Sequence, residues 1–302
     1  MKSPSDPRPT WRGGVMQIHI TRACDLACTN CTQGSNLGGK PVVMDLRQFT
    51  LAVRSIKDYP GVIGIFGGNP CIHPQFKEIC DILANEIPFE QRGLWSNNLN
   101  GHGKLCREIF NPEYSNLNVH CNQNAFMEMV RDWPECHPKG LADSRHSPPW
   151  VALKDIRDLS DEAREQLIEN CDINQYWSAM IGIFRNQLRG WFCEIAGAQS
   201  MLHAYEPDYP DTGFLINDNN WWKQPIKTFK HQIDKHCFEC GIPLKGRGSL
   251  GLGKDEFVSV THLPIYNLKK PLGKKIHMVS KLDDLGGHVI RATDYIENGV
   301  RV

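Results

Sequence analysis

Short apolar runs alternate with amphipathic stretches along the first two thirds of the 302-residue chain. The apolar runs have the length and the β-branched content of buried strands. Six strands are predicted, at residues 15–20, 61–66, 91–95, 116–121, 150–153 and 174–184. Strands that alternate with helices favour a parallel α/β architecture.

The intervening stretches predict helices over residues 46–59, 74–86, 161–171 and 190–203. Asp45 is the expected N-cap of the first helix, and Ser160 marks the start of the third. Beyond Tyr205 the periodicity fades into a segment rich in Pro, Asn and Trp. We therefore expect two units, a core over residues 1–204 and a loop-rich extension over residues 205–302.

The composition is that of an ordinary soluble globular protein, with 40% hydrophobic and 23% charged residues. The first 14 residues contain no apolar run, and no apolar stretch of about 18 residues occurs, so neither a signal peptide nor a membrane-spanning helix is expected. The predicted location is the cytoplasm. In that reducing compartment the 12 cysteines serve metals or chemistry rather than disulfides.

The net charge is zero, yet residues 223–281 carry 12 Lys and Arg against 4 Asp and Glu. A basic surface of this kind suits a small anionic substrate such as a nucleotide or a phosphorylated sugar. Nucleic acid is a possible but less favoured partner. The alternative is a solvated basic face that binds nothing in particular.

Three cysteines, Cys24, Cys28 and Cys31, follow directly on the first predicted strand. Three thiolates do not complete a tetrahedral zinc site, but they can bind three irons of a [4Fe–4S] cube and leave the fourth iron open for a second molecule. The alternative is a set of structural thiols.

The spacing of these cysteines resembles the CxxxCxxC signature of the radical S-adenosylmethionine (radical SAM) superfamily. The resemblance implies a partial (β/α)6 TIM-like barrel and a [4Fe–4S] cluster whose open iron chelates S-adenosylmethionine. It further implies reductive cleavage of S-adenosylmethionine to a 5′-deoxyadenosyl radical, which abstracts a substrate hydrogen. An electron donor such as flavodoxin or ferredoxin is then an expected partner.

The segment Gly67, Gly68, Asn69 and Pro70 looks like the GGEP segment of that superfamily, which binds the amino group of S-adenosylmethionine. Asn69 replaces the usual Glu, which removes a negative charge and keeps an acceptor oxygen. Ser96 and Asn98 follow the third strand and are candidates for the carboxylate or ribose, or else they cap a turn. Asn30 stands where an aromatic residue usually packs near the adenine.

A second metal site is predicted at Cys237 and Cys240, because a CxxC turn is a common ligand for zinc or iron–sulfur clusters. Cys193 is the expected third ligand; the fourth is Cys171, His236 or Glu194, or else one iron stays open. This arrangement resembles the auxiliary-cluster extensions (twitch or SPASM type) of radical SAM barrels. The alternative is a pair of reduced structural thiols.

The remaining features predict structure rather than chemistry. The glycines of residues 246–251 match GxGxxG but follow no strand, so we expect a flexible connection. Trp221 and Trp222 are expected to pack the extension, and Lys154 and Asp155 either reach the cavity or form a surface ion pair. Isolated cysteines, at positions 71, 80, 106, 121 and 136, are expected in the core.

The sequence therefore predicts a radical SAM enzyme acting on a small anionic metabolite. It does not choose among oxidoreductase, lyase and transferase outcomes. The alternatives are a radical SAM peptide maturase and a non-enzymatic iron–sulfur or zinc protein.

Overall fold

The computed structural model describes residues 14–37, 42–119, 122–136, 148–171, 173, 178–217, 221–244, 254–268 and 273–286. The glycine-rich segment 246–251 and Cys121 lie outside the described residues. Two sheets and eight α-helices, joined by short 3-10 turns, occur in the described parts. No helix among them has the length and apolar character needed to cross a membrane.

The strands are β1 Val15–Thr21, β2 Val62–Gly67, β3 Arg92–Ser96, β4 Asn116–Leu117, β5 Ser178–Phe184, β6 Gln187–Trp191, β7 Phe214–Leu215, β8 Asp255–Val258 and β9 Lys275–Met278. The helices are α1 Leu46–Ile56, α2 Phe76–Glu86, α3 Gly103–Ile109, α4 Gln123–Asp132, α5 Asp161–Glu169, α7 Glu194–Leu202, α8 Lys230–His236 and α9 Leu263–Leu268.

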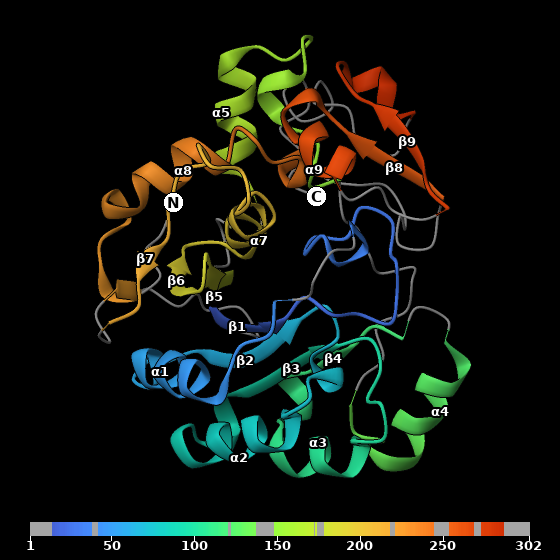
Figure 1. The fold of residues 1–302 in the computed structure, drawn as a ribbon, viewed down its shortest axis with the longest axis vertical. Helices are drawn as coiled ribbons and strands as arrows, with labels where there is room; N and C mark the ends of the chain where they lie inside the picture. The colour runs from blue at the N-terminus through green and yellow to red at the C-terminus, as the bar shows by residue number, and fades with distance from the viewer. Residues whose placement is uncertain are drawn as a thin grey trace.

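The main sheet has seven strands in the order β4-β3-β2-β1-β5-β6-β7. The first five strands of that order are parallel, whereas β6 is antiparallel to β5 and to β7. Helices α1 to α4 cover one side of this sheet, and the C-terminal elements lie on the other side (Figure 1). The parallel part is the α/β sheet that the sequence predicts, and β1 lies at its centre.

Alternation along β1 explains the two layers. Met16, Ile18 and Ile20 are buried in the core, because alternate residues of a strand point to one face. Gln17 and His19 lie on the opposite face and are also buried, so the sheet is covered on both sides. The carboxyl end of β1 therefore delivers the cysteine segment to the covered interior.

Most strand and helix predictions are confirmed, including the N-caps. Asp45 accepts a hydrogen bond from the Gln48 backbone N–H as part of a capping box, and Ser160 accepts one from Ala163. The predicted fourth strand is observed only as Asn116–Leu117. Helices α3 and α4 were not predicted, although Asn122 caps α4 with its side chain.

The fifth predicted strand, residues 150–153, is wrong. This segment is a turn that leads into a 3-10 helix at Leu153–Asp155. Its backbone N–H groups bind elsewhere: Ala152 donates to Ser259 Oγ and Lys154 donates to the Phe238 carbonyl. The run is apolar because it is buried against the C-terminal part of the chain, and β5 instead pairs with β1.

The predicted helix over residues 190–203 is also partly wrong, because its first residues belong to β6 and α7 begins at Glu194. The hairpin between β5 and β6 turns at Arg185 and Asn186, which both have positive φ. Such two-residue turns match the twist of paired strands. A strand follows directly, where the apolar spacing alone suggested a helix.

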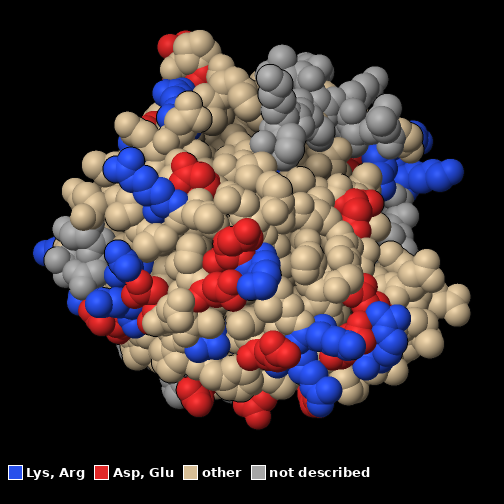
Figure 2. All heavy atoms as spheres, turned by 60° about the horizontal axis from the view of Figure 1, so that its bottom comes forward, with Lys and Arg blue, Asp and Glu red and all other residues tan. Residues whose placement is uncertain are grey.

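Charges of both signs are mixed on the surface. On the face shown in Figure 2, Lys and Arg side chains lie among Asp and Glu side chains. Several lysines of the basic segment are paired: Lys230 with Asp234, and Lys235 with Glu239. Both acids lie within residues 223–281 and are already counted there, so the excess of Lys and Arg in that segment remains.

Candidate metal centres

Cys24, Cys28 and Cys31 lie on the loop that leaves the carboxyl end of β1, where ligands bind in parallel α/β sheets. They are the three partly exposed cysteines among the eleven that the structure describes; the other eight are buried. The loop crosses the interior between the sheet and the C-terminal elements (Figure 1). These three thiols are therefore the accessible ones in the described part of the chain.

Asp25 organises this loop. Its carboxylate accepts hydrogen bonds from the side-chain amides of Asn69 (3.1 Å), Asn97 (2.8 Å) and Asn98 (3.0 Å). Burial acts to raise the pKa of Asp25, but the three amides outweigh it and leave that pKa below its usual value. An ionised carboxylate is thus fixed beside Cys24 and remains open to solvent on its outer side.

Gly67 and Gly68 pack the end of β2 directly against the start of the cysteine loop. A Cβ on Gly67 would lie 2.3 Å from the Thr21 carbonyl oxygen, and one on Gly68 would lie 2.3 Å from that of Ala23. The Gly68 and Asn69 backbone N–H groups donate to these same two carbonyls. Only glycine permits this approach, so the segment fastens the loop to the sheet.

Asn69 is fully buried, and both polar atoms of its carboxamide are hydrogen-bonded. Its oxygen accepts from the Cys71 backbone N–H (3.0 Å) and from Ser96 Oγ (2.8 Å), while its nitrogen donates to Asp25. A Glu at this position would set a second carboxylate against Asp25. Asn69 instead joins the ends of β2 and β3 to the cysteine loop.

Asn30 connects the loop to the C-terminal part of the chain. Its φ of 48° lies in the left-handed region, which Asn tolerates better than most residues. Its backbone N–H donates to Glu256 (3.0 Å), and its side-chain oxygen accepts from the Phe257 N–H (3.0 Å). The side chain that replaces the expected aromatic residue therefore anchors β8.

Glu256 is fully buried, and two of its three hydrogen bonds hold the loop while the third joins it to α9. Besides Asn30, its carboxylate accepts from Asn36 Nδ2 (2.5 Å) and Tyr266 OH (3.1 Å). Burial raises the pKa of Glu256, and these donors only partly oppose it.

Two further contacts fix the loop from the same side. Lys274 donates to Thr29 Oγ1 (2.8 Å), and the Trp150 indole N–H donates to the Cys31 carbonyl (3.0 Å). Both donors come from segments far from the loop in sequence. The cysteine loop is therefore held between the sheet and the C-terminal elements.

Burial also shifts the pKa values of the thiols of the loop. Burial, with smaller repulsion from neighbouring cysteines and Asp25, raises the pKa of Cys24 to about 12. Burial and Cys31 raise that of Cys28 to about 12, although Lys274 opposes them. These thiols need a nearby metal cation to ionise at neutral pH. The donor set of three thiolates fits a [4Fe–4S] cluster with one open iron.

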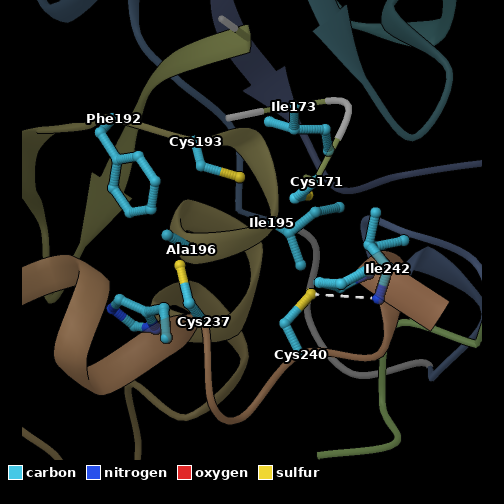
Figure 3. A pocket seen from close by; sticks show the side chains of 11 residues that line it. Cys171, Ile173, Phe192, Cys193, Ile195, Ala196, Cys237, Cys240 and Ile242 are labelled. Atoms are coloured by element: carbon cyan, nitrogen blue, oxygen red, sulfur yellow. Dashed lines mark hydrogen bonds between the residues drawn. The ribbon is translucent and has the colours of Figure 1, made fainter. Parts of the chain in front are cut away.

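A second group of cysteines lines one buried cavity (Figure 3). Cys171, Cys193, Cys237 and Cys240 surround it, and the rest of the lining is His236 and apolar residues. The predicted ligands Cys193, Cys237 and Cys240 are thus brought together. Of the proposed fourth ligands, Cys171 and His236 also line this cavity.

The second cavity differs chemically from the first loop. Burial, followed by the neighbouring Cys240, raises the pKa of Cys193 well above its ordinary value, and burial does the same for Cys240. The Ile242 backbone N–H donates to Cys240 Sγ (3.4 Å), a contact that favours a thiolate. Burial lowers the pKa of His236 to about 3, so its ring is neutral. Four cysteines in an apolar shell match the donor set of an iron–sulfur cluster.

Among the residues that the structure describes, no three His, Cys, Asp or Glu side chains converge on the position of a single metal ion. An iron–sulfur cube makes a different demand, because each thiolate binds a different iron.

These contacts give the positions of several other residues singled out in the sequence. Ser96 and Asn98 lie beside the cysteine loop, as expected for residues at the end of β3. Lys154 pairs with Glu239 (2.6 Å), whereas Asp155 binds Ser259 and Thr261. The tryptophans at 221 and 222 are buried, as are the isolated cysteines 71, 80, 106 and 136.

Sequence reasoning missed Asp25, Asn97, Glu256, Lys274 and Trp150. The position of Asp25 inside the cysteine spacing was the available signal for that residue. No signal in the sequence indicated the contact between Glu256 and Asn30, because 226 residues separate them.

Comparisons with known proteins are sparse. No family model matches the chain, and no curated protein matches it. Among solved structures, similarity is found to a chain described as "Crystal structure of BtrN in complex with AdoMet and 2-DOIA". The TM-score is 0.40 with 11% identity, over 65% of this chain and 82% of that chain. A likeness at this level carries no argument about function.

Proposed function

We propose that this protein is a radical SAM enzyme. The observation that carries the proposal is the loop after β1, which presents three partly exposed thiols beside an ionised, amide-held carboxylate. Cys24, Cys28 and Cys31 would bind a [4Fe–4S] cluster. Together with S-adenosylmethionine, the bound cluster supplies a 5′-deoxyadenosyl radical that removes a hydrogen atom from the substrate.

Asp25 is the residue best suited to the ammonium group of S-adenosylmethionine. It is ionised, it is held by Asn69, Asn97 and Asn98, and its outer side is open. The backbone N–H groups of Gly68 and Asn69 are occupied by loop carbonyls, so residues Gly67 to Pro70 support S-adenosylmethionine mainly by fixing Asp25. Ser96 and Asn98 remain our candidates for its other polar groups.

The second part of the proposal is a metal centre on Cys171, Cys193, Cys237 and Cys240. Support comes from the shared cavity, the apolar lining and the backbone N–H directed at Cys240. We favour an iron–sulfur cluster over zinc. Such a centre, shared between Cys171 and Cys193 of the core and the knuckle of an extension over residues 205–302, resembles the twitch or SPASM type.

The substrate we propose is a small anionic metabolite, because of the Lys and Arg excess of residues 223–281. Flavodoxin or ferredoxin would supply the electron, in the cytoplasm. The reaction subclass is not part of the proposal.

Formation of 5′-deoxyadenosine tests the proposal. The protein is reconstituted anaerobically with iron and sulfide and is then given dithionite and S-adenosylmethionine. We expect 5′-deoxyadenosine from the wild type and from Cys136→Ala, which removes a buried thiol outside both sites, but none from a Cys24/Cys28/Cys31→Ala variant. A fully loaded wild type that forms no 5′-deoxyadenosine would identify a non-enzymatic iron–sulfur protein instead.

A further inference from the structure

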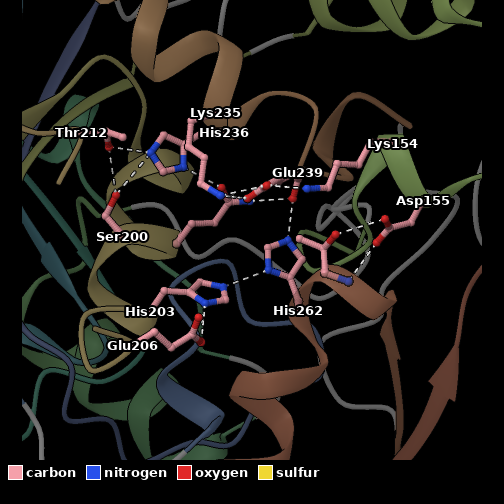
Figure 4. A network of polar contacts seen from close by, with 12 residues as sticks. Lys154, Asp155, Ser200, His203, Glu206, Thr212, Lys235, His236, Glu239 and His262 are labelled. Carbon is pink, nitrogen blue, oxygen red and sulfur yellow. Dashed lines mark hydrogen bonds and ion pairs between the residues drawn. The ribbon is translucent and has the colours of Figure 1, made fainter. Parts of the chain in front are cut away.

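A row of hydrogen bonds leads from the protein surface to the cysteine knuckle, residues 237–240 (Figure 4). Glu206 Oε1 lies 2.8 Å from His203 Nδ1, and His203 Nε2 lies 3.2 Å from His262 Nδ1. His262 Nε2 lies 2.6 Å from the backbone carbonyl of Glu239, which stands between Cys237 and Cys240. Three contacts therefore connect the Glu206 carboxyl with the knuckle peptide.

The Glu239 carbonyl at the end of the row determines which atom donates in each hydrogen bond. A carbonyl only accepts, so His262 Nε2 carries a hydrogen and the Nδ1 of the neutral ring is an acceptor. His203 Nε2 must then donate to it. Two neutral imidazoles supply two hydrogens for three contacts, so the third hydrogen lies between Glu206 and His203.

Loss of this extra proton breaks the row. With Glu206 as a carboxylate and both rings neutral, His203 donates to Glu206 and turns an unprotonated Nε2 toward His262. Either two ring lone pairs then face each other, or His262 turns a lone pair toward the Glu239 carbonyl. Each arrangement leaves a buried contact unsatisfied, which costs free energy.

Burial determines where the extra proton lies. His203 and His262 are buried, and desolvation lowers the pKa of each to about 4, which disfavours an imidazolium. The Glu206 side chain is 32% exposed, and burial raises its pKa. When the row carries its third hydrogen, these opposite shifts favour the Glu206 carboxyl over His203 as its site, and Glu206 is also the point of entry from solvent.

The surroundings of the row are mixed in charge. Lys235 and the Glu239 side chain face Glu206 and His203, and Asp155 and Glu239 face His262. The Tyr209 ring stacks on His203 at 4.5 Å, and His236 on α8 also lies near both histidines. The two acids and Lys235 carry charges of opposite sign, which oppose one another at the row. The number of hydrogens in the row therefore still decides whether its three contacts are satisfied.

The row ends at the backbone carbonyl of Glu239, inside the cysteine knuckle. The Glu239 carbonyl also accepts from Gln199 Nε2 (2.8 Å), so two buried donors hold the knuckle between its cysteines. The His262 ring packs edge-on against Trp150, whose N–H binds the Cys31 carbonyl. A change at His262 therefore reaches the four-cysteine cavity directly and the first loop through one aromatic contact.

We propose that Glu206, His203 and His262 form a one-proton relay that makes reduction of the four-cysteine site proton-coupled. The inference rests on the second metal centre of the proposed function. An electron delivered by a one-electron reductant adds negative charge next to the knuckle, which favours the protonated form of the relay. One proton then enters from solvent at Glu206, so one electron and one proton are taken up and no covalent bond changes.

The midpoint potential of the second centre tests the relay, in a Cys24/Cys28/Cys31→Ala background that retains only that centre. With one proton per electron, the wild-type relay should lower the potential by about 59 mV for each tenfold fall in proton concentration, within the responsive pH range. Glu206→Gln should abolish this slope, because its amide donates permanently to His203. Asp208→Asn, an exposed acid on the same turn, should keep the slope.

Ring-nitrogen NMR of ¹⁵N-histidine-labelled protein gives an independent readout. In Glu206→Gln we expect His262 Nε2 to stay protonated at every pH. In the wild type His262 should lose its fixed tautomer as pH rises. In Glu206→Ala it should lack a fixed tautomer at all pH values. A metal-loaded site with equal slopes in wild type and Glu206→Gln would overturn the relay alone. A Cys24/Cys28/Cys31→Ala variant without iron or zinc would overturn the second centre and, with it, the coupling.

Discussion

The two cysteine sites differ in access, polarity and support. Cys24, Cys28 and Cys31 are partly exposed, on a loop held by amides and a carboxylate. The four cysteines of the second site are buried in an apolar cavity, between the start of α7 and the knuckle. Three thiols with an open side suit a metal centre that binds a small molecule, whereas four thiols in a closed shell suit one that exchanges only electrons or braces the fold.

The difference also shows how each site is built. The first loop depends on contacts between distant segments, such as Glu256 with Asn30 and Lys274 with Thr29. The second site is assembled from three separate segments, because Cys171, Cys193 at the N-cap of α7 and the knuckle after α8 line one cavity. The C-terminal elements contribute to both, so the extension is part of the first site as well as the scaffold of the second.

The largest expected effect separates the sites by metal content. Cys237/Cys240→Ala removes two of the four thiols from the second site and leaves the first loop intact. We expect the loss of about half of the bound iron, because two thiols do not hold a cube, while 5′-deoxyadenosine still forms from S-adenosylmethionine. Iron analysis and product assay measure both. Unchanged iron in this variant would show that the cysteine knuckle binds no cluster; Cys136→Ala is the control.

A smaller effect is expected at the open site. Asp25→Asn removes the charge that three amides hold, and hydrogen bonds to a charged group contribute about 1.5–3 kcal/mol. We expect S-adenosylmethionine affinity to fall by about tenfold or more, with iron content unchanged. Equilibrium dialysis measures it, and Asp208→Asn is the matched control. Equal affinity in a fully loaded Asp25→Asn protein would remove Asp25 from the site.

Glu256 should make the clamp on the first loop sensitive to pH. Because burial raises its folded pKa above the unfolded value, its contribution to stability is complete below the unfolded pKa and is lost as pH rises through the folded pKa. Relative to Glu256→Gln, the free energy of unfolding of the wild type should decline as pH rises from about 4.5, by about 1.4 kcal/mol for each unit of pKa difference. Urea denaturation at several pH values measures this. A pH-independent difference would mean that Glu256 does not titrate with the fold.

Local signals predicted much of the fold. Asp45 and Ser160 marked helix starts, and the run from Val15 marked the central strand, because caps and periodicity are written in neighbouring residues. Residues 150–153 were wrongly predicted as a strand, because an apolar run can be buried without forming a strand. Here the run is buried against the C-terminal segment. The turn at Arg185 and Asn186 was missed because neither residue is glycine.

The same distinction between local signals and distant contacts separates the site residues that the sequence predicted from those that it did not. Cysteine spacing indicated both groups, and the structure brings Cys171 to the second cavity, which the sequence left open among three residues. Asp25 and Glu256 were out of reach, because their roles depend on partners supplied by other strands and by the far end of the chain.

The most direct test of the contrast between the sites is electron paramagnetic resonance of the reduced, iron-loaded protein with and without S-adenosylmethionine. We expect two cluster signals. S-adenosylmethionine should change only the signal that is missing in the Cys24/Cys28/Cys31→Ala variant. A single signal would contradict the second cluster, and a response to S-adenosylmethionine that persists in that variant would contradict the assignment of the open site to Cys24, Cys28 and Cys31.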